Sequence, residues 1–447
     1  MNTDKRVTAD RRDRIFALIY LLLGYGFIYT FSAGYFGRNL ALFTVCYVAA
    51  VLAYNLGKGK KLTVESVFWA CAVIGIGVPG AFWSIMPGLQ VLALIVAAAY
   101  WTLTASGRLL EEGKTSHWVF FDLWNAGVFV PFSNFGCQLR VLLGGGRSAA
   151  GTEEIKGAAP EEKAGTSGTG SRMRYAAGIG CGLILAIPLL MIVLPLLSSA
   201  DARFEAALGG LGIYLSEHFL ATLIRILFSL PVSAYLFGLV YGSIRGRYTD
   251  RIDREKVRAA GEKARMLPDT AFYTALGILC LVYVLFIWLQ AEYLFSAFAG
   301  IRPEGFTYAE YARQGFFELC VISFFNLFFL LCASLFSEHR MEENKGLRIL
   351  NVVLSVLTLL LIATAMSKLV MYIDVYGLTV NRILPQTFMI WMTVVYAAMI
   401  LRQRKVFPMA KICIMTGAVL FVLLCVVPVE DCVQAYNIWA RNLGLIR

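Results

Sequence analysis

Apolar residues gather in long runs along this chain, and short charged groups separate the runs. Each run holds roughly 20 residues, enough for a helix to cross about 30 Å of hydrocarbon. An outer-membrane barrel would instead show short alternating segments. The pattern predicts an all-α, polytopic helical bundle with about 11 membrane-spanning helices. The expected spans are 15–34, 39–57, 64–84, 88–106, 175–198, 217–243, 270–290, 315–337, 348–372, 383–401 and 409–428.

Basic residues are concentrated in the N-terminal segment and in every second loop. These segments are Lys5–Arg14, Lys58–Lys61, Arg108–Arg174, Arg245–Arg265, Arg340–Arg348 and Arg402–Lys411. Cytoplasmic loops of membrane proteins carry an excess of Lys and Arg. We therefore expect the N-terminus inside and the C-terminus outside.

One apolar segment, residues 118–135, contains polar residues that a spanning helix usually lacks. Asp122, Asn125 and Pro131 interrupt it. If it crossed, the basic linker that follows would lie outside, against the distribution of charge in the other loops. We expect an interfacial or re-entrant element instead, with Trp118 and Trp124 at headgroup depth.

A linker divides the chain into two membrane parts. Residues 144–173 are rich in Gly, Ala, Ser and Glu and have almost no apolar side chain to bury, which predicts a disordered cytoplasmic segment. Before it lies a four-span N-terminal part, residues 1–143, which includes the interfacial segment. After it lies a seven-span C-terminal membrane domain, residues 174–447. We expect the loop Arg245–Arg265 to form a short helix that is solvated or contacts headgroups.

Composition excludes several other classes of protein. The chain is 59% hydrophobic and 15% charged, whereas soluble domains carry about a quarter charged residues. Its 40 Lys and Arg residues outnumber 29 acids, but they lie in loops that set topology, so the expected partner is the lipid bilayer and not nucleic acid. The ten cysteines are scattered, and no histidine has a second ligand at metal spacing. We expect no metal, cofactor or catalytic constellation.

Two glycine patterns lie inside predicted spans. Gly75, Gly77 and Gly80 spell G-x-G-x-x-G, but a dinucleotide site needs a strand before the loop. Close helix packing is the interpretation that fits a spanning segment. Gly238 and Gly242 form a small-xxx-small pair, which lets a neighbouring helix approach closely.

The segment 290–319 joins two apolar runs and is rich in Tyr, Glu and Arg. Thr307 and Glu310 stand three residues apart, as in a capping box, so we expect a helix to begin at Thr307. On that helix Tyr311 and Glu318 share a face. Glu318 would then lie below the membrane surface, where a carboxylate needs a partner.

Ionisable and tyrosine side chains near the outer face form the candidate site. An isolated charge at mid-membrane costs about 2.5–3.5 kcal/mol, so such charges should be paired or face water. We expect Glu318 to pair with Lys368 or Arg225 and to form an outward-facing polar pocket; the alternative is a set of interhelical ties that bind no ligand. The candidate residues are Arg225, Glu292, Tyr308, Tyr311, Arg313, Glu318, Lys368, Asp374 and Arg382.

Several pieces of the C-terminal part carry a family resemblance. They are L-L-S-S-A-D-A-R-F at 196–204, Tyr293–Phe295 with Thr307–Leu319, Y-I-D-V-Y-G-L-T at 372–379 with Arg382, and Tyr436-Asn437. Over about residues 175–447 the chain resembles a bacterial multi-pass membrane protein family, domain of unknown function 4173. The resemblance implies a protein of the bacterial inner membrane and implies no substrate or reaction.

Three functions are open at this point. The first is a non-catalytic envelope or regulatory component that contacts partner proteins, which predicts charges sealed against one another. The second is a transporter of an ion or small solute, which predicts a water-filled cavity reaching past Glu318. The third is an enzyme acting on a lipid or glycan at the outer leaflet, with Glu292, Glu310, Glu318 or Asp374 as acid or base. We rank them in this order, and the sequence indicates no particular oligomeric state.

Overall fold

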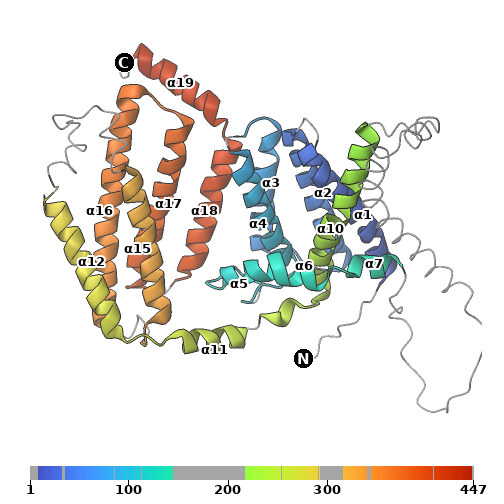
Figure 1. The fold of residues 1–447 in the computed structure, drawn as a ribbon, viewed down its shortest axis with the longest axis horizontal. Helices are drawn as coiled ribbons and strands as arrows, with labels where there is room; N and C mark the ends of the chain where they lie inside the picture. The colour runs from blue at the N-terminus through green and yellow to red at the C-terminus, as the bar shows by residue number, and fades with distance from the viewer. Residues whose placement is uncertain are drawn as a thin grey trace, which may run out of the picture. The chain divides into compact units, whose positions relative to one another are not determined.

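The computed structural model describes residues 9–32, 36–84, 86–111, 113–143, 217–252, 254–289, 291, 316–339, 344–405 and 407–444 (Figure 1). These residues form helices and contain no strand. The long helices are α1 (Arg11–Ser32), α2 (Phe36–Gly57), α3 (Val64–Gly77), α4 (Pro87–Ala105), α10 (Glu217–Arg245), α12 (Asp269–Leu289), α15 (Phe316–Phe336), α16 (Lys345–Tyr376), α17 (Val380–Arg402) and α18 (Met409–Val426). The short ones are η1 (Pro79–Ala81), α5 (Val119–Trp124), η2 (Asn125–Phe129), α6 (Val130–Ser133), α7 (Cys137–Leu142), η3 (Thr249–Arg251), α11 (Arg254–Ala264) and α19 (Val429–Asn442).

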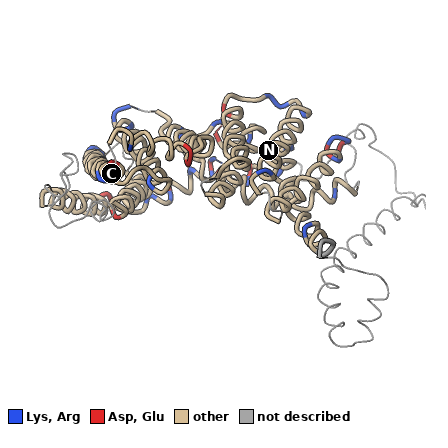
Figure 2. The backbone as a smooth tube through the Cα atoms, turned by 90° about the horizontal axis from the view of Figure 1, so that it is seen from above, with Lys and Arg blue, Asp and Glu red and all other residues tan. Residues whose placement is uncertain are grey.

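Ten helices among the described residues are long and apolar enough to cross a membrane. They coincide closely with ten of the predicted spans, so the all-α polytopic bundle is confirmed. The other predicted span, 175–198, and the predicted linker lie outside the described residues. Figure 2 shows how the charged residues are distributed: they occupy short stretches of the backbone, and long uncharged stretches separate them.

Local side chains define where some spans begin. The Thr63 side chain accepts the Ser66 N–H at 3.1 Å at the start of α3. At the start of α16, Asn344 accepts from the N–H groups of Gly346 and Leu347. Both side chains satisfy backbone donors that have no partner within the helix.

The chain forms two compact units. Unit 1 comprises Met1–Phe82, Ile95–Arg108 and Asp122–Arg251, and unit 2 comprises Trp83–Leu94, Leu109–Phe121 and Ile252–Arg447. In unit 1, helix α1 packs against both α2 and α10. The buried Tyr20 ring lies at the centre of this packing and meets the rings of Tyr47 and Phe237 edge-on.

The segment 118–135 forms the short helices α5, η2 and α6. The apolar helical run Val119–Ser133 is shorter than a membrane span. In Figure 1, α6 and α7 lie crosswise at one end of α10, and both contact it. Asn125 donates to the Thr249 carbonyl at 2.9 Å, and Asn134 donates to the Arg247 carbonyl at 3.1 Å. Asn125, one of the residues that made the segment a poor span, and Asn134 therefore bind it to the residues that follow α10, and its interfacial placement stays a prediction.

Unit 2 is built on α12, α15, α16 and α17, which share one apolar core. A chain of polar side chains, buried at Asn326 and Thr358, crosses this core: Tyr283 donates to Asn326 at 2.7 Å, and Asn326 donates to Thr358 at 2.9 Å. These three residues belong to three different helices. Hydrogen bonds between helices hold a bundle together where lipid supplies no hydrophobic driving force.

Candidate functional site

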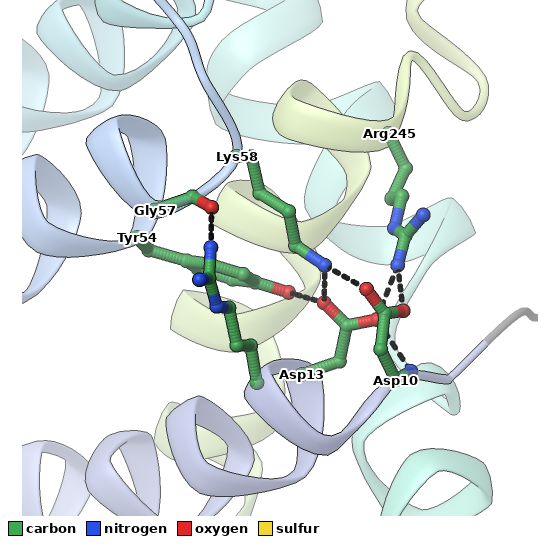
Figure 3. Close-up of polar contacts among 7 residues, drawn as sticks. Asp10, Asp13, Tyr54, Gly57, Lys58 and Arg245 are labelled. Atoms are coloured by element: carbon green, nitrogen blue, oxygen red, sulfur yellow. Dashed lines mark hydrogen bonds and ion pairs between the residues drawn. The ribbon is translucent and has the colours of Figure 1, made fainter.

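The most fully built polar site in unit 1 surrounds Asp13, in the first turn of α1 (Figure 3). Tyr54 near the end of α2, Lys58 just after it, and Arg245 at the end of α10 all point at this carboxylate. Asp10 lies immediately before α1 and completes the group. We call these five residues the Asp13 cluster.

Asp13 is completely buried. One of its oxygens accepts the Tyr54 hydroxyl at 2.6 Å and lies 2.9 Å from the Lys58 ammonium. The other accepts from Arg245 at 2.5 Å and from the Asp10 backbone N–H at 3.0 Å. A carboxylate offers about four acceptor positions, so the protein itself supplies a donor for each one.

Asp10 makes the cluster electrically balanced. Its carboxylate is half exposed and contacts both Lys58 and Arg245. Two acids therefore face two cations, and α1, α2 and α10 are tied at one end. A solute could reach Asp13 only by displacing one of these contacts. The geometry therefore suits a contact that holds helices together better than a binding site.

Sequence reasoning missed the Asp13 cluster. Asp13 stands among Arg11, Arg12 and Arg14, and that basic start was interpreted only as a topology signal. The available hint was an acid at the first turn of a span. Its partners could not be identified, because Arg245 follows Asp13 by 232 residues.

The predicted outward cluster is only partly described. Glu292, Tyr308, Tyr311 and Arg313 lie outside the described residues, and so does the predicted helix start at Thr307. The described part of that helix, α15, begins at Phe316.

Within unit 2, Glu318 and Lys368 do not form the expected pair, and the alternative pairing of Glu318 with Arg225 stays a prediction. Glu318 is exposed in the first turn of α15, whereas Lys368 is buried inside α16. Within the part of the chain that the structure describes, no ion pair of 4.0 Å or less joins them. Arg225 belongs to unit 1, where it donates to the Ser32 carbonyl at 3.3 Å and lies over the Tyr29 ring.

Arg382 organises the corner between α16 and α17. Its guanidinium lies over the Tyr372 ring, 3.9 Å from the centroid, and donates to the Gly377 carbonyl. Gly377 has a φ of 78°, a conformation that glycine adopts without strain. Asp374 is exposed beside this corner.

Asn437 of α19 also binds this corner. Its side chain accepts the Leu378 N–H at 2.7 Å and donates to the Leu378 carbonyl at 2.9 Å. The 372–379 piece and the Tyr436-Asn437 piece, both singled out in the sequence, therefore meet in space. Sequence reasoning did not predict α19 as a helix.

A second polar group closes the opposite end of unit 2, at the start of α12 and α16. Asp269 accepts from Ser337 at 2.6 Å, from Asn344 at 2.7 Å and from the His339 backbone N–H at 3.3 Å, and it also contacts His339 Nδ1 at 2.9 Å. Ser337 and His339 both bind the carboxylate, which is the arrangement of a structural cap and not of a nucleophile activated by a base.

Other possible sites carry little chemistry. In the described chain, no group of three or more His, Cys, Asp or Glu side chains could hold a metal ion. A small, mostly apolar cavity in unit 2 is lined by Trp83, Gln90, Leu384 and Cys425 among others, and none of the predicted site residues lines it.

Comparisons with known proteins add a family and no activity. The model of the family described as Domain of unknown function (DUF4153) matches residues 67–444. The family expected from the resemblance, domain of unknown function 4173, is therefore corrected, and the match also takes in N-terminal spans where no motif stood out. No curated protein matches the chain, and no solved structure matches it either.

Proposed function

The chain belongs to the DUF4153 family, whose function is unknown, and from the geometry we propose that it is a non-catalytic component of a bacterial inner membrane. In this proposal it acts by contacts with partner proteins of the cell envelope. It turns over no substrate of its own.

The observation that carries this proposal is the closure of the Asp13 cluster. A buried acid is the side chain most expected to serve transport or acid–base chemistry in a membrane protein. Here its four acceptor positions are occupied by Tyr54, Lys58, Arg245 and the Asp10 backbone. Charges that neutralise one another in this way support fastening of helices and leave binding to the protein surface.

The α16–α17 corner is the surface that we assign to partner contact. Asp374 and Tyr376 are exposed there. Arg382 and Asn437 hold the backbone beneath them. In the predicted topology this corner faces the outside, and exposed side chains on a fixed backbone bind with little loss of conformational entropy.

Photocrosslinking in living cells tests the proposal. A benzophenone amino acid at Tyr376 should give one discrete, reproducible crosslinked envelope protein. The same amino acid at Thr270, which is exposed at the other end of unit 2, should not give that product. Absence of any discrete product at Tyr376 contradicts the proposal.

A transporter is the second candidate, because α16 carries a buried lysine. Lys368 is 1% exposed, and Ser355, Thr358 and Thr364 are buried on the same helix. Polar residues along one spanning helix are a feature of ion and solute paths. Saturable flux in liposomes that is lost in Lys368→Met would favour this candidate over the first.

A further inference from the structure

Helix α11 is tethered to the ends of α12 and α15, two helices long and apolar enough to span a membrane. Only four residues separate its end at Ala264 from the start of α12 at Asp269, and four residues reach at most about 14 Å. That connection is itself bound to the end of α15, because the Leu267 N–H donates to the Phe336 carbonyl at 3.2 Å. In Figure 1, α11 lies crosswise beside the lower ends of α12 and α15.

The charges of α11 are arranged by angle around its axis. At about 100° per residue, Val257 and Ala264 share one face, and Val257 is buried. Glu255 and Glu262 lie on nearly the opposite face. Two flanks separate these faces.

Both flanks are basic. Lys256 and Lys263 occupy one, and Arg254 and Arg258 occupy the other; all four side chains are exposed. In the described chain, neither lysine makes an ion pair within 4.0 Å, whereas Arg258 pairs with Glu262 at 3.4 Å. The lysine flank therefore has the stronger uncompensated charge.

This angular order fits a helix lying in the plane of the headgroups. In this orientation the two flanks lie level with the lipid phosphates, the acids face water and the apolar face is turned toward the membrane interior. Met266 follows directly and is 77% exposed, as expected for a side chain that reaches the boundary of the acyl chains. In the predicted topology this end of unit 2 is cytoplasmic, where anionic lipids are concentrated.

We infer that α11 binds the headgroups of anionic phospholipids in the inner leaflet, through the flank formed by Lys256 and Lys263. The contact orients the connection into α12 relative to the bilayer. It is independent of whether the α16–α17 corner binds an envelope partner.

A crosslinker on this flank tests the inference in the full-length protein. A benzophenone amino acid at the exposed Ala260 is introduced, and the protein is reconstituted in nanodiscs of three parts phosphatidylethanolamine to one part phosphatidylglycerol. Mass spectrometry then compares the two lipid adducts. We expect the ratio of phosphatidylglycerol to phosphatidylethanolamine adducts to exceed the bulk ratio of the two lipids, and each lysine to raise this ratio by up to about fivefold.

Three variants decide the interpretation. Lys256→Gln with Lys263→Gln should abolish the enrichment, and Lys256→Arg with Lys263→Arg should keep it. Glu255→Gln with Glu262→Gln changes the net charge by the same amount as the double lysine variant, in the opposite direction and on the water-facing side. This variant should not reduce the enrichment. Two results in nanodiscs would each overturn the inference: phosphatidylglycerol adducts at the bulk share of that lipid, or enrichment that survives the double glutamine variant. A third result that would overturn it is crosslinking of the same position to another protein or to nucleic acid, in place of lipid, in cell membranes.

Discussion

At the scale of single residues, the Asp13 cluster illustrates how a membrane protein keeps a charge inside. A carboxylate without water needs donors, and Tyr54, Lys58 and Arg245 supply them from α2, the turn after it and α10. The same contacts that lower the cost of burying Asp13 also fix the ends of these helices. Removing the acid would leave two cations with one half-exposed counterion.

Asp13→Asn should therefore destabilise the protein by about 3 kcal/mol, the cost typical of breaking a buried ion pair from one side. Thermal unfolding of the purified protein in mild detergent measures this as a lowered midpoint. Asp10→Asn is the matched control, because its side chain is 53% exposed, and it should change stability by no more than about 1 kcal/mol. Equal midpoints for wild type and Asp13→Asn would contradict the importance of the cluster.

Glycines form the second residue-scale feature, since they set how closely helices approach. A Cβ at Gly238 would lie 2.8 Å from the Pro131 carbonyl oxygen, and one at Gly242 would lie 2.3 Å from the Asn134 amide nitrogen. The small-xxx-small interpretation is confirmed, with α6 as the helix that approaches. Gly77 likewise faces Thr44 at a distance too short for a Cβ, as the packing interpretation of the G-x-G-x-x-G pattern requires.

Gly238→Ala should cost about 1–3 kcal/mol, because the new methyl group meets backbone that cannot rotate away. Gly277→Ala in α12 is the control, since nothing lies within 4 Å of its Cβ position. Alanine is the better helix former, so this control should be neutral or stabilising by up to about 1 kcal/mol. Denaturation midpoints of the two variants in the same detergent give the comparison, and a Gly238→Ala variant as stable as the control would refute close packing there.

At the scale of elements, α19 shows how one side chain can bind a surface helix to the connection between two spanning helices. The Asn437 side-chain amide accepts a hydrogen bond from the Leu378 N–H and donates one to the Leu378 carbonyl. Ile438 and Trp439 of the same helix are exposed. The Asn437 amide therefore fixes α19 to the α16–α17 corner, and the buried Val429 and Ala440 pack the same helix against the protein.

Asn437→Ala should release the α16–α17 corner, because it removes two hydrogen bonds of about 1 kcal/mol each. The Leu378 amide should exchange its proton on the order of tenfold faster or more, as measured by hydrogen–deuterium exchange on peptides covering 372–382. Gln434→Ala, on an exposed position of α19, should leave this rate unchanged. An unaltered rate in Asn437→Ala would mean that other contacts hold the corner.

At the scale of the whole molecule, the alternation of basic loops is the feature that assigns inside and outside. It predicts a cytoplasmic linker and an external segment between α12 and α15. Both proposals depend on it, since it places α11 on the inner side and the α16–α17 corner on the outer side.

Cysteine labelling measures this orientation directly. In a background with all ten native cysteines replaced, Ser167→Cys should react with an impermeant maleimide only after the inner membrane is opened. Glu304→Cys should react in intact spheroplasts. Labelling of Ser167→Cys from the outside would reverse the topology.

Much of the fold was predictable, but little of the candidate site was. The spans were found because hydropathy and length act locally, and the ends of α12 and α15 fall within two residues of their predicted limits. The relation between Glu318 and Lys368 could not be predicted in the same way, because two charges at similar predicted depth can still point in different directions. The side chain of Glu318 is exposed on α15, while the side chain of Lys368 on α16 is buried.

From its sequence alone this chain is determined to be a bundle of apolar helices, since each span satisfies its own backbone hydrogen bonds and needs only about 20 suitable residues in a row. Tertiary structure decided which polar groups meet. Asp13 finds Tyr54 at a separation of 41 residues and Arg245 at 232, and Asn437 finds Leu378 at 59. Contacts between distant residues depend on how helices rotate and pack against one another, and that information is not contained in any local stretch.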